Sequence, residues 1–314
     1  MIKKYIFGID LGGTAIKFGF FDEKCRLLKK WSIATDKTNN GENILHDISK
    51  ETEKCISEYK IKTENIVGTG ISVPGPVDDT GLVRGCVNIG WGYKKVGEEL
   101  EKLTGIKTFV LNDANAAGMG EVINGCGGKY KRAVMITIGT GIGGAVIENG
   151  NIVSGSRGNA GEIGHFKMST PDGSKLLDME YFSSAVGIVR FVNEKRKEYP
   201  TSPINKIKNI EVRDIANFAK EGDELSLLAF DMAGKYIGLG LSYIAGTVDP
   251  EIFIIGGGVS LAGEIIIEPI KKYFSQYAFN TEKEIPFAAA SLGNDAGIYG
   301  AAEFVAANIK EEQL

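Results

Sequence analysis

Residues 9–17 read Ile9-Asp10-Leu11-Gly12-Gly13-Thr14-Ala15-Ile16-Lys17, a glycine turn between two apolar segments. The apolar residues before the turn predict a strand over Lys4–Asp10. After the turn, apolar and polar residues alternate as far as Phe20, which is typical of a second strand with one buried face. We therefore expect a β-hairpin in which Asp10 lies at the end of the first strand.

The same arrangement occurs again in the second half of the chain. Val134–Ile138 predicts a strand, Gly139-Thr140-Gly141-Ile142-Gly143-Gly144 forms a glycine turn, and Ala145–Ile147 predicts a strand that returns from it. A strand, a glycine turn and a strand that occur twice predict a duplicated α/β domain. We expect an active-site cleft between the two copies.

The two glycine turns predict phosphate binding. Glycine lets backbone N–H groups approach phosphoryl oxygens without a Cβ clash, so two turns facing each other across a cleft would hold a polyphosphate. Asp10 offers the hard oxygen ligands that Mg2+ prefers, directly or through water. The alternative interpretation is that both segments are tight turns without a ligand.

Other nucleotide-binding motifs fit this sequence less well. Gly139–Gly144 matches Gly-x-Gly-x-x-Gly, but the dinucleotide fingerprint needs a helix to begin at the turn, and the following residues predict a hairpin. The Gly-x-x-x-x-Gly-Lys string of a P-loop does not occur in the sequence.

A further acidic residue follows a predicted strand. Phe109–Leu111 predicts the end of that strand, and the Ala-rich residues after Asp113 predict a helix that ends at Asn124-Gly125. A side chain at such a strand-to-helix turn lies at the mouth of a crevice, which favours a functional role for Asp113. Aspartate is also a common helix N-cap, and this second interpretation stays open here.

Five polar residues are candidate hydrogen-bond partners of a polyol: Asn88, Asn112, Glu162, His165 and Glu180. Three of them lie in the polar segment 151–182, which we expect to be irregular, and His165 is one of only 2 histidines. A lone histidine is more often a structural residue than a ligand. Because no cysteine follows Cys126, no zinc site is predicted.

The composition excludes several classes of partner. A net charge of -4 and a pI near 5.5 argue against nucleic acid. The longest uncharged runs are shorter than the roughly 20 apolar residues that span a membrane. The cysteines are far apart, and the apolar run Tyr5–Ile9 is shorter than a signal-peptide core of roughly 7–15 residues. We therefore expect a cytoplasmic protein.

The remaining patterns outline two domains. Four further elements are expected: a helix over 42–60, a strand over Ile66–Val73, a strand over Ile252–Ile255 and an Ala-rich helix from about Asp295. We place a small N-terminal α/β domain at residues 1–113, completed by the C-terminal helix at about 295–314. A large C-terminal α/β domain is expected at residues 114–294.

In this order along the chain, these motifs resemble those of the ROK sugar kinases, which have the actin–hexokinase fold. The resemblance covers most of the chain through six segments: Ile9–Lys17, Ser72–Val77 with Asn88–Trp91, Asn112–Ala117, Thr137–Gly144, Gly161–His165 and Gly256–Gly258. It implies duplicated ribonuclease-H-like domains of the actin/hexokinase type, ATP and Mg2+ as cofactors, a sugar substrate and a homodimer. Neither nucleic acid nor a membrane is an expected partner.

Together with the residue chemistry, the resemblance implies roles for individual side chains. Asp113 would be the catalytic base that accepts the proton of the sugar hydroxyl, and Asp10 would assist with Mg2+. The expected sugar-binding residues are Gly75, Asn88, Asn112, Asp113, Glu162, His165 and Glu180. The expected ATP-binding residues are Asp10, Gly12, Gly13, Thr14, Lys17, Thr140, Gly141, Gly257 and Gly258.

One segment departs from the family pattern. Family members usually follow the histidine with a zinc-binding run, Cys-x-Cys-Gly-x-x-Gly-Cys-x-Glu, whereas Lys167–Glu180 contains no cysteine. We therefore predict no structural zinc and expect His165 to contact the sugar without a metal. The change leaves the shape of the sugar loop, and with it the identity of the sugar, open.

The resemblance implies an ATP-dependent hexose kinase that phosphorylates the 6-hydroxyl group, with glucose as the expected sugar. N-acetylmannosamine, fructose and β-glucosides are alternatives within the family. A sugar-sensing regulator without catalysis is the alternative from another class, and such regulators carry a helix-turn-helix ahead of the first phosphate motif. Because the first predicted strand begins almost at Met1, we expect no such DNA-reading domain.

Overall fold

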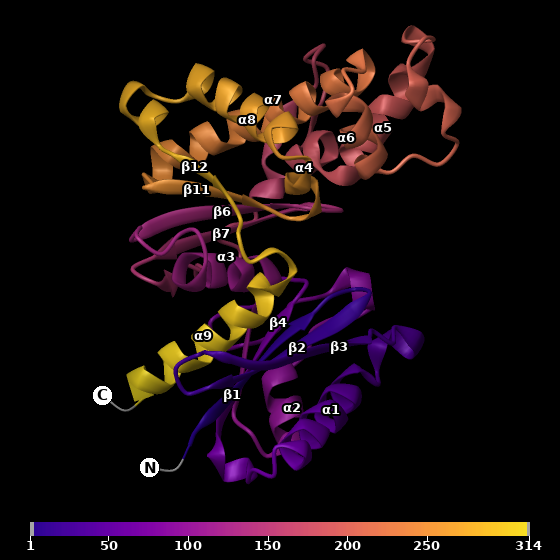
Figure 1. Ribbon diagram of the computed structural model, residues 1–314. Helices are drawn as coiled ribbons and strands as arrows, with labels where there is room; N and C mark the ends of the chain where they lie inside the picture. The colour runs from indigo at the N-terminus through magenta and orange to yellow at the C-terminus, as the bar shows by residue number, and fades with distance from the viewer. Residues whose placement is uncertain (1–2, 313–314) are drawn as a thin grey trace. The chain divides into compact units, whose positions relative to one another are not determined.

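The computed structural model describes residues 3–312 of the chain (Figure 1). Contacts between residues divide the chain into two compact units, and the α/β class expected from the sequence is confirmed. The first unit contains the chain up to Lys129, Ala145–Ala160 and the chain from Asn294 onward. The second contains Tyr130–Gly144 and Gly161–Gly293. The domain limits expected from the sequence stay a prediction.

A five-stranded sheet forms the centre of the first unit, in the order β3-β2-β1-β4-β5. The strands are β1 (Tyr5–Leu11), β2 (Ala15–Asp22), β3 (Leu27–Ala34), β4 (Ile66–Val73) and β5 (Thr108–Asn112). β2 pairs antiparallel with β1 and β3, whereas β4 is parallel to β1 and β5. The first predicted hairpin is therefore confirmed, and Asp10 of β1 lies opposite Lys17 of β2.

Helices cover both faces of this sheet. They are α1 (Ile44–Glu58), α2 (Val96–Thr104) and α9 (Ala296–Glu312), and a further helix, α3 (Asp113–Asn124), packs against α9. Ile9 belongs to the core shared with α1 and α2, whereas Ile6 belongs to the core shared with α9. Figure 1 shows α9 along one face of the sheet and α1 and α2 along the other. Because side chains alternate along a strand, Asp10 lies on the same face as Ile6, toward α9.

Two glycines let α9 approach the sheet and α3 closely. A Cβ atom built on Gly8 of β1 would lie 2.1 Å from the carbonyl oxygen of Ile298. A Cβ atom built on Gly300 would lie 1.7 Å from the carbonyl oxygen of Ala116 in α3. Because the neighbouring atom in each case belongs to a helix backbone, a side chain at either position would push α9 out of place.

The second sheet has the order β12-β11-β6-β7-β8, and the boundary between the two units falls within β7. Its strands are β6 (Arg132–Ile138), β7 (Ile142–Glu148), β8 (Asn151–Ile152), β11 (Ile252–Gly256) and β12 (Phe287–Ala289). β11 is parallel to β6 and β12, just as β4 is parallel to β1 and β5. The strand order of the first sheet is thus repeated, and the duplication predicted from the glycine turns is confirmed.

The α-helices of the second unit follow the glycine turn Gly139–Gly144 along the chain. They are α4 (Met179–Ser183), α5 (Ala185–Lys195), α6 (Val212–Lys220), α7 (Glu224–Val248) and α8 (Glu264–Tyr277). The long helix α7 packs side by side with α8 (Figure 1). No helix in residues 3–312 has both the length and the apolar character needed to cross a membrane.

A small hairpin lies within the segment that we expected to be irregular. It consists of β9 (Lys167–Ser169) and β10 (Leu176–Asp178), which pair antiparallel. The expectation of an irregular chain was wrong here, because strands this short give too few alternating residues to detect.

Candidate active site

The N-cap of α3 is Asn112, the residue before Asp113. The side-chain oxygen of Asn112 accepts hydrogen bonds from the backbone N–H groups of Ala114 (2.9 Å) and Asn115 (3.1 Å). Asn112, and not Asp113, is therefore the N-cap, and Oδ1 of Asp113 accepts from the Ala114 N–H (2.8 Å) and from the Asn112 amide (3.1 Å). The side chain of Asp113 is exposed in the first turn of the helix, where a negative charge complements the helix dipole.

The loop beside Asn112 is packed too closely to admit another side chain. The Asn112 amide donates to the carbonyl oxygen of Gly75 (3.2 Å), and a Cβ atom built on Gly75 would lie 2.1 Å from the carbonyl oxygen of Gly85. Burial raises the pKa of the neighbouring Cys86 thiol to about 12, and the charge of Asp113 adds to this rise. Cys86 is therefore a buried apolar side chain that packs beside Gly75, and it is not a nucleophile.

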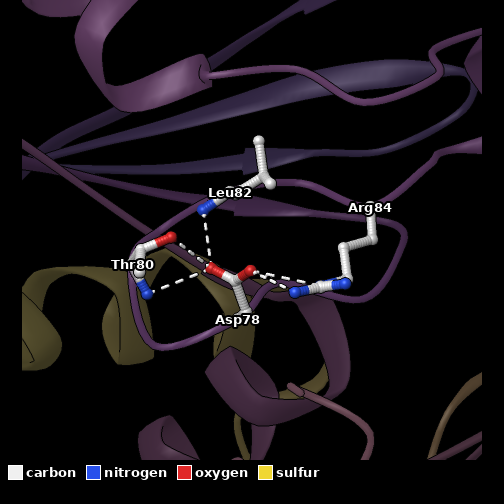
Figure 2. A network of polar contacts seen from close by, with 4 residues as sticks. All are labelled: Asp78, Thr80, Leu82 and Arg84. Carbon is white, nitrogen blue, oxygen red and sulfur yellow. Dashed lines mark hydrogen bonds and ion pairs between the residues drawn. The ribbon is translucent and has the colours of Figure 1, made fainter. Parts of the chain in front are cut away.

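A buried aspartate holds the loop that follows Gly75 in shape. Figure 2 shows the carboxylate of Asp78 with its partners Thr80, Leu82 and Arg84. It accepts from the Thr80 hydroxyl (2.6 Å) and the Leu82 N–H (3.1 Å), and it pairs with the Arg84 guanidinium (2.9 Å). These hydrogen bonds, that of the Thr80 hydroxyl above all, lower the pKa of Asp78, so the carboxylate stays ionised and bound at neutral pH.

Asp10 is held on both sides by its neighbours in the sheet. Its carboxylate accepts from the Lys17 ammonium of β2 (2.9 Å) and from the Ser72 hydroxyl of β4 (2.9 Å). The Lys17 ammonium also donates to the carbonyl oxygen of Asn294 (3.1 Å), just before α9. Because each carboxylate oxygen already has a partner, these residues fit a Mg2+ ion bound through water better than one bound directly.

The first glycine turn is tight, and Asn88 lies beside it. The backbone N–H of Gly12 donates to the carbonyl oxygen of Ala15 (3.0 Å) and closes the turn between β1 and β2. The Cβ atom of Asn88 lies 3.9 Å from where a Cβ on Gly13 would stand. Asn88 is exposed in the short helix η3 (Val87–Ile89), so its amide is available to a ligand at this turn.

The second glycine turn is closed by a carboxylate. Glu180 of α4 accepts from the backbone N–H of Ile142 (3.2 Å). A Cβ atom built on Gly141 would lie 2.6 Å from the same carboxylate oxygen, so glycine makes room for this contact. Thr140 and Glu180 also line a cavity of about 380 Å³ in the second unit. The strand β7 follows this turn directly, which excludes the helix that a dinucleotide fingerprint requires.

Three of the expected polyol-binding residues come together in the second unit. Glu162 is half-buried just before the short helix η4 (Ile163–His165). Burial raises the pKa of Glu162 above its ordinary value of 4.5, His165 opposes this rise, and Glu180 adds to it. The other two expected residues, Asn88 and Asn112, belong to the first unit, so the complete set stays a prediction.

Two residues near His165 were missed by the sequence analysis. Asp178 lies with one carboxylate oxygen 3.3 Å from Nδ1 of His165, and Lys167 forms an ion pair with the other oxygen. Atoms of His165, Asp178 and Glu180 that could ligate a metal lie within 4.8 Å of one another. A signal was present in the sequence, because Asp178 stands two residues before Glu180, where the family's zinc-binding run has its last cysteine.

The turn after β11 also requires glycine. Gly257 has a φ of 83°, and a Cβ atom built on it would lie 2.5 Å from the carbonyl oxygen of Ile138 at the end of β6. The short helix η7 (Gly258–Ala262) begins directly after it. This geometry keeps the backbone of the turn close to the second glycine turn within the same sheet.

The raised pKa of Glu162 leads to a prediction about stability. Between the ordinary pKa of 4.5 and the higher folded-state pKa, the folded protein binds more protons than the unfolded chain, so Glu162 lowers stability as the pH rises through this window. We expect Glu162→Gln to be more stable than the wild type at pH about 7, with the difference lost below pH about 4.5. Urea unfolding followed by circular dichroism at both pH values measures this; a wild type that is the more stable protein at neutral pH would contradict it.

Comparison with known proteins identifies relatives over nearly the whole chain. A sequence model described as the ROK family matches residues 6–308. The chain is 35% identical to a glucokinase of Halalkalibacterium halodurans, with 96% of this chain and 94% of that protein covered. It is 33% identical to a glucokinase of Thermotoga maritima, with 97% of this chain and 98% of that protein covered.

Solved structures agree with the sequence relatives. A crystal structure of a ROK family glucokinase from Streptomyces griseus, in complex with glucose and AMPPNP, matches with a TM-score of 0.79 at 31% identity, covering 96% of this chain and 98% of that chain. A ROK hexokinase from Thermus thermophilus matches with a TM-score of 0.78 at 28% identity, covering 99% and 100%. The family match spans nearly the whole sequence and includes both glycine turns, and the chain therefore belongs to the ROK family.

Proposed function

We propose that this protein is an ATP-dependent hexose kinase that transfers the γ-phosphoryl group of ATP to the 6-hydroxyl of glucose. The observation that carries the proposal is the exposed carboxylate of Asp113 in the first turn of α3, where the Ala114 N–H (2.8 Å) and the Asn112 amide (3.1 Å) orient it through Oδ1. Relatives named glucokinase, and a ROK glucokinase crystallised with glucose and AMPPNP, support the choice of substrates.

Asp113 is the proposed general base. As the sugar oxygen attacks the γ-phosphorus, the new P–O bond forms, the bond to the β–γ bridging oxygen breaks and ADP leaves. The proton of the sugar hydroxyl passes to the Asp113 carboxylate. General base catalysis of this kind contributes a factor of about 10² to 10⁴ in rate. The rest of the acceleration in phosphoryl transfer comes from positioning and charge stabilisation.

The two glycine turns are the proposed phosphate-binding elements. Backbone N–H groups of Gly13, Thr14, Thr140 and Gly141 can donate to phosphoryl oxygens, whereas the N–H of Gly12 is bonded to the Ala15 carbonyl and shapes the turn. Gly257 and Gly258 can contact the nucleoside. Asp10 would hold Mg2+ through water, and the ion would neutralise charge on the phosphates. Lys17 forms an ion pair with Asp10, so its proposed role is to orient the Asp10 carboxylate.

Gly75, Asn88, Asn112, Glu162, His165 and Glu180 are the proposed sugar contacts. Acceptors and donors at fixed positions discriminate between sugars, because a missing hydroxyl leaves a buried polar group of the protein unpaired. We also propose that the protein is a homodimer, which rests on the resemblance to the family. We place it in the cytoplasm, because the widely spaced cysteines do not suggest a disulfide framework.

ADP release with Mg-ATP across a panel of sugars tests the proposal. The panel contains glucose, N-acetylmannosamine, N-acetylglucosamine, fructose, mannose and a β-glucoside, and we expect the highest kcat/KM with glucose. A preference for another sugar of the panel would support phosphoryl transfer but identify that sugar, and not glucose, as the substrate. Absence of turnover on every sugar, in a protein that binds ATP and glucose, would instead indicate a sensor and refute the kinase assignment.

A further inference from the structure

The hairpin β9–β10 brings a lysine and an aspartate to the histidine of the predicted sugar site. Antiparallel pairing places Asp178, the last residue of β10, opposite Lys167, the first residue of β9. The backbone N–H of Met179 donates to the carbonyl oxygen of Phe166 (2.8 Å). This bond extends the pairing at the open end of the hairpin, next to His165 in the sequence. The carboxylate of Asp178 therefore lies between two side chains, with one oxygen on the Lys167 ammonium and the other 3.3 Å from Nδ1 of His165.

We propose that Asp178 is a positioning residue that accepts the Nδ1–H of His165 and so leaves Nε2 as a hydrogen-bond acceptor for the sugar. The identity of the ligand in this inference rests on the proposed function, whereas the tautomer of the His165 imidazole does not. The ion pair with Lys167 lowers the pKa of Asp178, with a smaller effect from His165, so the carboxylate is ionised at neutral pH. An ionised carboxylate can only accept, which makes Nδ1 of His165 the donor in this pair.

The tautomer decides which groups of a ligand this cluster can bind. With Nδ1 protonated, Nε2 is a pure acceptor, and Glu162 and Glu180 likewise offer carboxylate oxygens. A sugar position that faces the three residues must then present O–H or N–H donors. With the opposite tautomer, Nε2 would donate and would bind an ether or carbonyl oxygen instead.

The same residues fit a metal less well. His165, Asp178 and Glu180 have suitable atoms within 4.8 Å of one another, but the Lys167 ammonium already contacts the Asp178 carboxylate. A divalent cation on that carboxylate would lie next to a like charge, which is unfavourable. Lys167–Glu180 contains no cysteine, and the Lys167 ammonium places a positive charge beside the Asp178 carboxylate.

The ring state of His165 can be measured directly. The chain has only 2 histidines, and the other, His46, lies in α1, so protein labelled with ¹⁵N-histidine gives two sets of ring signals, which His165→Gln assigns. At pH about 8, where imidazole is usually neutral, we expect the Nδ1–H tautomer for His165 in the wild type. In Asp178→Ala we expect a shift toward the Nε2–H form that free imidazole favours, with His46 unchanged.

Kinetics with glucose provide the second readout. We expect Asp178→Ala to raise the KM for glucose about tenfold, as loss of one hydrogen bond to a charged group does, with kcat and the KM for ATP within about twofold. Asp178→Glu keeps the acceptor and should restore most of the affinity. The matched control is Asp172→Ala, because Asp172 lies in the turn of the same hairpin and bonds locally, to the Thr170 hydroxyl (2.6 Å) and to the N–H (3.1 Å) and hydroxyl (2.9 Å) of Ser174.

Three results would overturn the proposal: an unchanged His165 tautomer in Asp178→Ala, an equal rise in KM in Asp172→Ala, or stoichiometric metal in the purified protein whose removal by a chelator alters the His165 signals. The ring signals do not depend on activity. A protein without kinase activity that shows the expected tautomers would therefore refute the proposed function and leave this inference standing.

Discussion

Asp113→Asn folds as the wild type does and loses at least about 100-fold in kcat: this is the result that we expect from the position of Asp113 at the start of α3. The substitution keeps the size of the side chain and removes the base, and loss of general base catalysis costs about 10² to 10⁴ in rate. Stability should change little, because Asn112 caps the helix. The lost charge in the first turn is worth at most about 1 kcal/mol.

The measurement is steady-state ADP release with glucose at saturating Mg-ATP, together with urea unfolding of both proteins. A matched control is Asp47→Asn, since Asp47 also lies in the first turn of a helix, α1, and carries no proposed role. We expect wild-type turnover from that variant. Near-normal turnover of Asp113→Asn would show that Asp113 is not the general base. A large loss of stability would show that the role of Asp113 is structural.

Gly300→Ala should destabilise the first unit by about 3 kcal/mol or more, at the upper end of what overpacking costs. The added Cβ would lie 1.7 Å from the carbonyl oxygen of Ala116 and 2.9 Å from the backbone nitrogen of Gly120, both in α3. Neither is the end of a flexible side chain, so α3 and α9 must separate to make room. The separation would also move Asp113, and we therefore expect a lower kcat at temperatures where the variant is still folded.

Tryptophan fluorescence during urea unfolding measures this effect in the correct unit, because both tryptophans, Trp31 and Trp91, belong to the first unit. The control is Gly92→Ala, where a Cβ atom would meet nothing within 4 Å. That variant should stay within about 0.5 kcal/mol of the wild type. If Gly300→Ala behaved in the same way, the close packing of α9 on α3 would be wrong.

Local patterns predicted the elements that bear the site. The alternation after Gly13 and the apolar run before Gly139 correctly predicted both hairpins, and their recurrence predicted the duplicated topology. The strand β3 and the helix α8 were not identified. On the edge strand β3 half-buried and exposed positions alternate but the residue types do not follow them, since Leu28 is exposed and Lys29 is half-buried. The helix α8 contains Pro269, which weakens a helical pattern.

By itself the sequence determined the glycine turns, the strand-to-helix turn at Asp113 and the family, because these depend on residues close together in the chain. The tertiary structure alone decided which side chain caps α3, which face of β1 Asp10 occupies and which carboxylate meets His165. Asp10 contacts Ser72 from another strand, and Asp178 meets His165 only through the pairing of β9 with β10. Strand pairing and helix packing bring such residues together, and a spacing along the chain does not encode that proximity.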